Sequence, residues 1–268
     1  MVATALTGCA IQEPPDARRQ TAETSTGVGG TGDSGPSPRE TPDARRQTPG
    51  EATTAPPTEA PITSPPPSTT TLPVRTIEVI ERAGWGAAEA GPGMVEHAIE
   101  RLTIHHTGVE LGENRLAPAR LKAHQEFHQG ERGWPDLAYH FAVDPGGNIY
   151  EGRSPQFRGD TATSYDPTGH FLVVLEGNFD IEATAGPQIV SLTELLAWAA
   201  RYYSVGTDTI KSHRDFAETT CPGQNLYALL RSGELVAAVN SILDREDIDL
   251  AYLRGTEALD RVTHIESP

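Results

Sequence analysis

Hydrophobic and polar positions follow two different periods between residues 76 and 246. Runs rich in β-branched and apolar residues predict four strands, at 101–106, 138–144, 148–152 and 171–176. A Pro-Gly-Gly sequence after Asp144 joins the second and third runs and suits a hairpin turn. Because a hairpin is antiparallel, the pattern predicts a sheet of mixed direction.

Segments with helical periodicity lie between and after these strands, at 116–129, 224–230 and 234–243. A further helix is predicted from Ser191 to about residue 203, because Ser191 and Glu194 form a capping-box sequence. Leu192, Leu195 and Leu196 recur on one face of this helix and predict a core stripe. Alternating strands and helices indicate an α/β domain, with a central mixed β-sheet flanked by helices.

Residues 1–75 differ in composition from the rest of the chain. They hold 13 of the 22 prolines, are rich in Thr, Gly and Ser, and contain no aromatic residue. Such a segment lacks the apolar area that would offset the entropy of ordering, so we expect a disordered linker. The predicted organisation is a linker at 1–75, a single folded domain at 76–246 and an acidic surface tail at 247–268.

The start of the chain contains Leu6-Thr7-Gly8-Cys9, which resembles the lipobox of bacterial lipoproteins. The resemblance implies that Cys9 is lipidated and tethers the protein to a membrane. It also implies a truncated signal, because no apolar stretch of about 7–15 residues precedes Cys9. The alternative is secretion with a cleaved signal upstream and an incidental cysteine. No apolar run of about 18 residues occurs, so we expect no membrane span.

The net charge of the chain limits its partners. The formal net charge is −16 at pH 7. Nucleic-acid phosphates demand a basic face, so this acidity argues against nucleic acid as a partner.

Two side chains of metal-binding type, His213 and Cys221, stand eight positions apart. A catalytic zinc site takes three protein ligands and leaves a fourth position to water. The third ligand is expected at His105 or His106, where an apolar, β-branched run ends. Adjacent strand residues face opposite sides, so one of the two can point at the metal. The alternative is that His213 caps a turn and Cys221 is a small buried hydrophobe.

Several stretches together resemble a known family. They are His105-His106-Thr107, Gly133-Trp134-Pro135-Asp136 with Tyr139-His140-Phe141, Ser212-His213-Arg214-Asp215, and Thr220-Cys221-Pro222-Gly223. In order and spacing they resemble the zinc amidases of the peptidoglycan-recognition-protein and phage-lysozyme type, over about residues 77–230. The resemblance implies an amidase domain that uses Zn²⁺ to hydrolyse the amide between N-acetylmuramic acid and L-alanine in peptidoglycan.

The resemblance also implies roles for single residues. The zinc ligands are then His105, His213 and Cys221, and the hydroxyl of Tyr139 stabilises the oxyanion of the intermediate. His106 is expected to hydrogen-bond a neighbour or to pack against one instead. Contacts with the substrate are implied for five further residues: Arg153, Arg158, Tyr165, Asn178 and Thr219.

Two departures from the family pattern bear on activity. Thr219 stands where some members have a catalytic lysine, and threonine cannot act as a cationic acid. The sequence at 159–162 is Gly-Asp-Thr-Ala, where the family often has Gly-x-His-Ala, so a usual site histidine is replaced by Thr161. The sequence therefore leaves the proton shuttle unassigned.

His124 and His128 form a competing candidate metal site, because they are spaced i, i+4 on a predicted helix. The pattern is close to His-Glu-x-x-His, but Gln125 follows the first histidine and Glu126 projects from a different angle of the helix. The sequence therefore argues against a metallopeptidase site, and His128 matches a family position that is expected to be structural.

Three functions remain open from the sequence. The first is a zinc-dependent N-acetylmuramoyl-L-alanine amidase, a monomeric cell-wall hydrolase that acts on peptidoglycan or muropeptides outside the cytoplasm. The second is a non-catalytic peptidoglycan-binding domain, and the third is a structural lipoprotein of the cell envelope. Non-catalytic family members typically lack the cysteine ligand, so Cys221 favours the enzyme.

Overall fold

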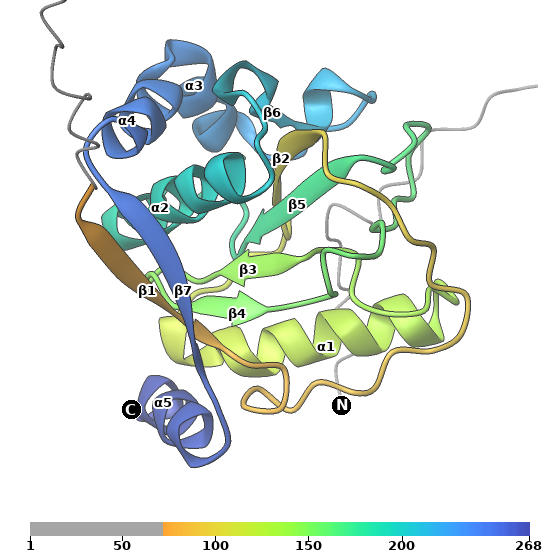
Figure 1. The fold of residues 1–268 in the computed structure, drawn as a ribbon. Coiled ribbons are helices and arrows are strands. Elements are labelled where there is room, and N and C mark those ends of the chain that lie inside the picture. The colour runs from red at the N-terminus through yellow and green to blue at the C-terminus, as the bar shows by residue number, and fades with distance from the viewer. Residues whose placement is uncertain (1–71) are drawn as a thin grey trace, which may run out of the picture. The chain divides into compact units, whose positions relative to one another are not determined.

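One seven-stranded sheet organises the computed structural model, which describes residues 72–268 (Figure 1). The strand order is β6-β2-β5-β3-β4-β1-β7. The strands are β1 (Val74–Ile80), β2 (Arg101–His106), β3 (Phe141–Val143), β4 (Ile149–Glu151), β5 (His170–Leu175), β6 (Lys211–Ser212) and β7 (Asp247–Leu253). Strands β2, β3, β4 and β5 correspond to the four predicted runs, with small differences at their ends.

The hairpin of β3 and β4 makes the sheet mixed, as predicted. These two strands pair antiparallel, whereas the other neighbouring strands pair parallel. At the turn, the carboxylate of Asp144 accepts hydrogen bonds from the backbone and side-chain amides of Asn148, at 2.9 and 3.1 Å. The Asx turn and the Pro-Gly-Gly sequence therefore set the hairpin register.

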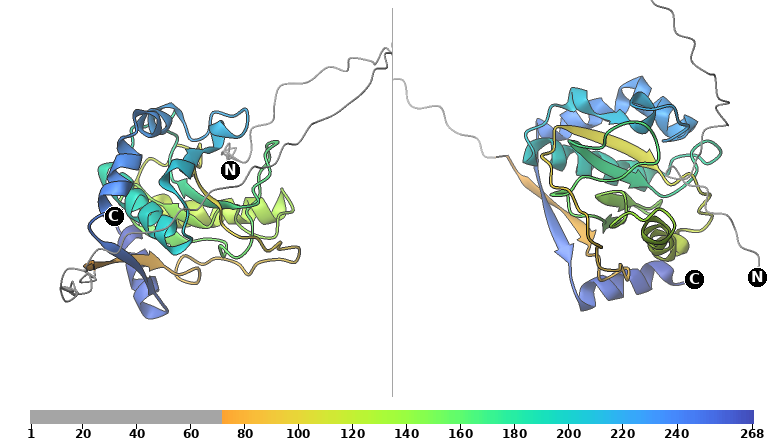
Figure 2. Two further views of the ribbon diagram at one scale, coloured as in Figure 1. Left: turned by 45° about the horizontal axis from the view of Figure 1, so that its top comes forward. Right: turned by 90° about the vertical axis from the view of Figure 1, so that its right-hand side faces the viewer.

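Helices cover both faces of the sheet (Figures 1 and 2). On one face α2 packs with α3 and α4, and on the other α1 packs with α5. The helices are α1 (Ala117–Gly130), α2 (Gly186–Tyr202), α3 (Gln224–Ser232), α4 (Glu234–Leu243) and α5 (Thr256–Glu266), with 3-10 turns η1 (Asn114–Leu116), η2 (Thr207–Thr209) and η3 (His213–Asp215). Each face of the sheet thus has its own hydrophobic core.

Helix α2 begins five residues earlier than its predicted start at Ser191. Pro187 lies in its first turn, where a missing backbone N–H carries no penalty. The hydroxyl of Ser191 donates to the carbonyl of Gly147 at 2.6 Å, so the capping box was a wrong prediction. The predicted core stripe is confirmed, because Leu192, Leu195 and Leu196 are fully buried.

The C-terminal residues are part of the fold, so the predicted surface tail at 247–268 was wrong. Strand β7 pairs with β1 over seven residues, from Val74↔Asp247 to Ile80↔Leu253. Helix α5 buries Ala258 and Val262. It packs so closely that a Cβ atom on Gly84 would lie 2.6 Å from that of Ala258. The alternation of apolar Ile248, Leu250 and Tyr252 was the signal for a strand.

Some predictions concern residues 1–71, which include Cys9 and most of the predicted linker. These residues lie outside the part of the chain that the structure describes. Strand β1 begins at Val74, two residues before the predicted domain boundary. Among residues 72–268 no single helix has the length and apolar composition to cross a membrane. Helices α3 and α4 meet those criteria only together, as a pair bent by 57°.

Candidate functional site

Strand β2 ends in His105 and His106, whose side chains face opposite sides of the sheet. His105 is in register with Val174, which belongs to the core on the α1 side. His106 is in register with Leu175, which belongs to the core on the α2 side. The Nδ1 atom of His106 accepts a hydrogen bond from the backbone N–H of Phe179 at 3.3 Å. As predicted, His106 binds a neighbour, and His105 is the histidine that approaches His213 and Cys221.

Local hydrogen bonds hold His213 and Cys221 at the end of β6. The carboxylate of Asp215 accepts hydrogen bonds from the backbone N–H and the hydroxyl of Ser212, at 2.8 and 2.7 Å. This capping box closes η3 around His213. The backbone N–H of Arg214 donates to the carbonyl of Cys221 at 3.0 Å, which ties the following loop to η3. Both candidate ligands are therefore fixed by the same short segment.

The structure brings His105, His213 and Cys221 together in a buried cluster. One donor atom from each lies within 4.8 Å of the others. The Sγ atom of Cys221 is 3.6 Å from Nδ1 of His105, and the rings of the two histidines are 4.8 Å apart. Within residues 72–268 this is the one such group of three, and it joins a strand end to a loop more than a hundred residues away.

The protonation states in this cluster suit a metal ion. Burial lowers the pKa of His105 well below its ordinary value and lowers that of His213 to about 4. Both imidazoles are therefore neutral at pH 7, which is the form that binds a metal. Two imidazole nitrogens and the thiolate of a reduced Cys221 are also a donor set that zinc accepts. With Cys221 in its reduced form, the cluster can thus hold a metal ion.

Tyr139 lies against this cluster, in the segment that precedes β3. The centre of its ring is 5.1 Å from that of His105, and only 5% of the side chain is exposed. The residue was predicted to lie in a strand, but β3 begins at Phe141. Burial raises the pKa of Tyr139, and the nearby carboxylate of Glu176 raises it further. The hydroxyl therefore stays protonated and can donate a hydrogen bond.

An open pocket of about 370 Å³ lies beside the cluster, in the segment 158–167. Arg158 and Tyr165 are among the residues that line it. The ring of Tyr165 is 5.0 Å from that of His213, and Arg158 lies 3.5 Å from the carboxylate of Asp166. The hydroxyl of Thr163, which also lines the pocket, is 2.7 Å from Nε2 of His213. Two of the predicted substrate-binding residues therefore share a pocket that adjoins the cluster of His105, His213 and Cys221.

Arg153 is not placed to contact a substrate, contrary to the expectation from the sequence. Its side chain is 1% exposed. The guanidinium donates to the carbonyls of Leu137, Arg158 and Asp136 and to the carboxylate of Asp160. Arg153 therefore joins the segment before β3 to the segment that lines the pocket.

The other two predicted substrate-binding residues, Asn178 and Thr219, lie on separate loops. Thr219 is half-buried, and its hydroxyl accepts a hydrogen bond from the backbone N–H of Cys221 at 3.2 Å. Asn178 is half-buried in the turn that follows β5, next to Phe179, which bonds His106. Thr219 therefore borders the cluster and shapes the loop that carries Cys221, whereas Asn178 lies next to the partner of His106, on the other face of the sheet.

The alternative histidine pair does not form a metal site. His124 and His128 are buried on α1, whereas Glu126 is exposed. The Nδ1 atom of His128 accepts a hydrogen bond from the backbone N–H of Ala138 at 3.2 Å. That of His124 lies 3.5 Å from the buried carboxylate of Glu176. His128 is therefore structural, as expected.

Comparison with known proteins gives the family. The model of the N-acetylmuramoyl-L-alanine amidase family matches residues 96–224. Peptidoglycan-recognition protein SC1a of Drosophila melanogaster is 30% identical over 162 residues, which are 58% of this chain and 85% of that protein. The N-acetylmuramoyl-L-alanine amidase of Sus scrofa is 32% identical over 158 residues, which are 56% of this chain and 26% of that protein.

A solved structure of a related protein supports the same family assignment. It is that of peptidoglycan recognition protein LE in complex with tracheal cytotoxin, a monomeric diaminopimelic acid-type peptidoglycan, with a TM-score of 0.53 and 26% identity. The match covers 57% of this chain and 92% of that one. The chain therefore belongs to the N-acetylmuramoyl-L-alanine amidase family, which it shares with the peptidoglycan-recognition proteins.

Proposed function

We propose that this protein is a zinc-dependent amidase that hydrolyses the bond between N-acetylmuramic acid and L-alanine in peptidoglycan. The observation that carries the proposal is the buried cluster of His105, His213 and Cys221, with the ring of Tyr139 5.1 Å from that of His105. A family member that only binds peptidoglycan would not need a complete set of metal ligands next to a hydrogen-bond donor.

The residues of the chain have separate tasks in this reaction. His105, His213 and Cys221 would hold the metal, which when bound supplies a Lewis acid and lowers the pKa of a water molecule. The neutral hydroxyl of Tyr139 donates a hydrogen bond to the oxyanion that develops as the amide is attacked. Burial of the cluster excludes bulk water and strengthens that hydrogen bond.

The pocket beside the cluster suits the peptide part of the substrate. Arg158 is half-buried there and supplies a cation that can bind a carboxylate of the stem peptide. Tyr165 supplies a ring and a hydroxyl that is buried without a hydrogen-bond partner among the described residues. The complex of the related protein LE with a peptidoglycan monomer supports the same class of ligand.

We also propose that the domain acts outside the cytoplasm, because peptidoglycan lies there. The membrane tether through a lipidated Cys9 is part of this proposal and concerns residues outside the described part of the chain.

The proposal is tested by incubating the protein with a muropeptide, with and without a chelator, and measuring free peptide and bound metal. We expect one zinc ion per chain and release of peptide from intact glycan. Cys221→Ser should lower zinc affinity sharply and abolish cleavage, because a neutral hydroxyl replaces a thiolate. Full activity of this variant would refute the ligand assignment. Muropeptide binding without any cleavage by the native protein would instead identify a binding domain.

A further inference from the structure

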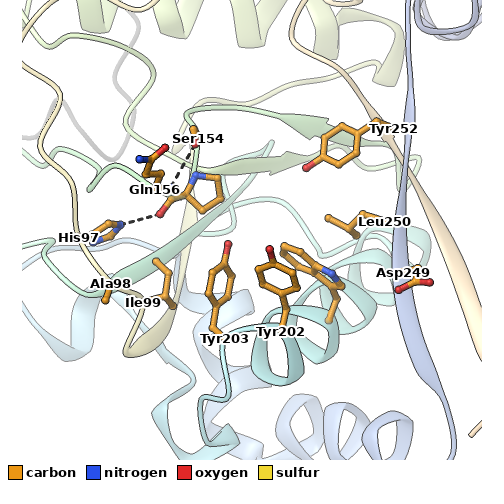
Figure 3. Close-up of a pocket in the computed structure, with 12 residues that line it drawn as sticks. His97, Ala98, Ile99, Ser154, Gln156, Tyr202, Tyr203, Asp249, Leu250 and Tyr252 are labelled. Carbon is orange, nitrogen blue, oxygen red and sulfur yellow. Dashed lines mark hydrogen bonds between the residues drawn. The ribbon is translucent and has the colours of Figure 1, made fainter. Parts of the chain in front are cut away.

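A second pocket, of about 930 Å³, lies on the domain away from the metal cluster (Figure 3). Its walls come from the segment before β2, the segment after β4, the end of α2 and strand β7. Ile99 lines the pocket and precedes β2, whereas His105 lies at the other end of that strand. Six residues of extended chain separate the two sites by roughly 20 Å. The pocket is also within the size range of ligand sites, about 300–1,000 Å³.

Aromatic rings from two elements face each other across this pocket. Trp198 and Tyr202 of α2 are stacked, with ring centres 5.0 Å apart and planes at 22°. Tyr203 stands edge-on to Tyr202 at 4.9 Å, and Tyr252 of β7 lies on the opposite side (Figure 3). The side chain of Tyr202 is 68% exposed. Exposed apolar surface gathered in one concave place is typical of a binding site.

Three tyrosine hydroxyls line this pocket. The hydroxyls of Tyr202, Tyr203 and Tyr252 point toward the space between the rings (Figure 3), and none of them has a hydrogen-bond partner among the described residues. Burial raises the pKa of Tyr252 to about 12 and also raises that of Tyr203. The hydroxyls of Tyr203 and Tyr252 are therefore protonated, and each can donate and accept a hydrogen bond.

The charge of the pocket excludes anionic ligands. No Lys or Arg lines it, and Asp249 contributes a carboxylate. His97 is already engaged, because its Nε2 donates to the carbonyl of Pro155 at 3.2 Å and its Nδ1 accepts from the backbone N–H of Gly169 at 2.9 Å. A nucleotide or a lipid phosphate would therefore find no cation here. A sugar ring, with an apolar C–H face and hydroxyls around it, matches both the rings and the neutral donors.

We propose that this pocket is a carbohydrate-binding site, separate from the metal cluster, which takes a neutral N-acetylhexosamine segment of a glycan strand. The choice of N-acetylhexosamine rests on the proposed function, since the substrate glycan consists of such sugars. The site would hold one stretch of the polymer while the metal cluster acts on another. Strand β7 and its Tyr252 lie beyond residue 224, where the family match ends. The site is thus built with a part of this chain that the family model does not include.

The proposal is tested by titrating a peptide-free N-acetylglucosamine tetramer into the full-length protein and measuring heat of binding. We expect saturable binding that Tyr202→Ala weakens by about tenfold, because one exposed ring is lost. Val190→Ala is the matched control. Val190 also lies on α2 and is 56% exposed, but it belongs to the first turns of that helix. Release of peptide from a soluble muropeptide should be the same for Tyr202→Ala and the native protein.

Cys221→Ser separates this proposal from the proposed function. Binding of the tetramer should persist in that variant even though its metal site is disabled, and it should be measurable even if the native protein cleaves nothing. Equal affinity of the native protein and Tyr202→Ala would overturn the proposal, as would loss of binding in Cys221→Ser alone. A dimer in sedimentation that Tyr202→Ala dissociates would also overturn it, because a second copy of the chain would then cover the pocket.

Discussion

The hydroxyl of Thr163 lies 2.7 Å from Nε2 of His213, and the hydroxyl of Thr161 lies 2.8 Å from that of Thr163. Two threonines therefore support a candidate metal ligand from the loop in which family members often have a histidine at position 161. A metal-binding imidazole is usually oriented by a hydrogen bond to its second nitrogen. The threonine pair can supply that bond in this chain.

Removal of this hydrogen bond should weaken metal binding. We expect Thr163→Val, which keeps the shape of the side chain, to lower zinc affinity by roughly 10–100-fold. Competition with a chromogenic chelator measures the affinity. Thr263→Val is a matched control, because the Thr263 hydroxyl bonds a helix carbonyl of α5 far along the chain. Native affinity in Thr163→Val would show that the hydroxyl does not orient His213.

Tyr139→Phe should separate metal binding from catalysis. The phenylalanine ring keeps the packing against His105 but removes the donor to the oxyanion. We expect kcat to fall by roughly 10²–10³, with the zinc content unchanged. Steady-state cleavage of a muropeptide and metal analysis of the same sample give both values. Loss of zinc in this variant would mean that Tyr139 supports the ligands instead.

Substitution by Met should lower the stability of the protein at Arg153 but affect substrate binding at Arg158. The buried guanidinium of Arg153 serves three backbone carbonyls and Asp160. Arg153→Met should therefore lower the free energy of unfolding by roughly 3 kcal/mol or more, because these acceptors lose their donor. Chemical denaturation measures the change.

Arg158→Met is the comparison for that experiment. In the native protein the Arg158 side chain lies in the pocket beside the cluster, and its guanidinium forms an ion pair with the carboxylate of Asp166 at 3.5 Å. A half-exposed ion pair of this kind contributes at most about 1 kcal/mol to stability. We expect Arg158→Met to raise KM for a muropeptide and to leave the unfolding free energy nearly unchanged. Equal destabilisation by both substitutions would contradict the assignment of their roles.

Buried neutral histidines should make stability depend on pH. Burial lowers the pKa of His128 and of His140 to about 3, and their ring nitrogens already accept backbone hydrogen bonds. The unfolded chain protonates these residues near pH 6.5, whereas the folded chain does not. Stability should therefore be complete above pH 6.5 and fall as the pH drops from 6.5 toward 3. Thermal unfolding of the metal-free protein at several pH values measures this, and a constant midpoint from pH 6.5 to 4 would contradict it.

Parts of the candidate metal site could be predicted from local signals, whereas the choice of His105 as the third ligand came from the family resemblance. Strand alternation separates His105 from His106, and the positions of His213 and Cys221 within one short stretch suggest a shared site. The mixed sheet followed from a Pro-Gly-Gly turn. Each inference uses residues that are close in sequence, where the geometry of a strand or turn decides the outcome.

The remaining features depend on contacts between distant segments. Arg153 has its partners in two loops, and its isolated charge gave no sign that it would be buried. The bond from Thr163 to His213 spans 50 residues. Parallel pairing of β1 with β7 joins two segments from opposite ends of the described chain, and no turn sequence predicts such a pairing. The sequence therefore shows which side chains have the chemistry to bind a metal or a substrate, and the tertiary contacts decide which of them a substrate can reach.

Removal of residues 247–268 should destabilise the whole domain. The truncation removes β7 and α5, whose Ile248 and Val262 are 7% and 8% exposed. Burial of two such side chains contributes roughly 3–6 kcal/mol to the free energy of unfolding. The truncation also breaks the ion pair between Arg201 and Asp247, at 2.7 Å, and turns β1 into an unpaired edge that can associate with other chains.

We therefore expect the chain that ends at residue 246 to unfold at lower denaturant and to aggregate. Chemical denaturation and light scattering measure the two effects. A chain that lacks only Ser267 and Pro268 is the matched control, because both residues are exposed and follow the end of α5. If the chain ending at 246 unfolded like this control, β7 and α5 would be an appendage, and the core formed by the other strands would be sufficient. The register of seven paired residues between β1 and β7 argues for the opposite result.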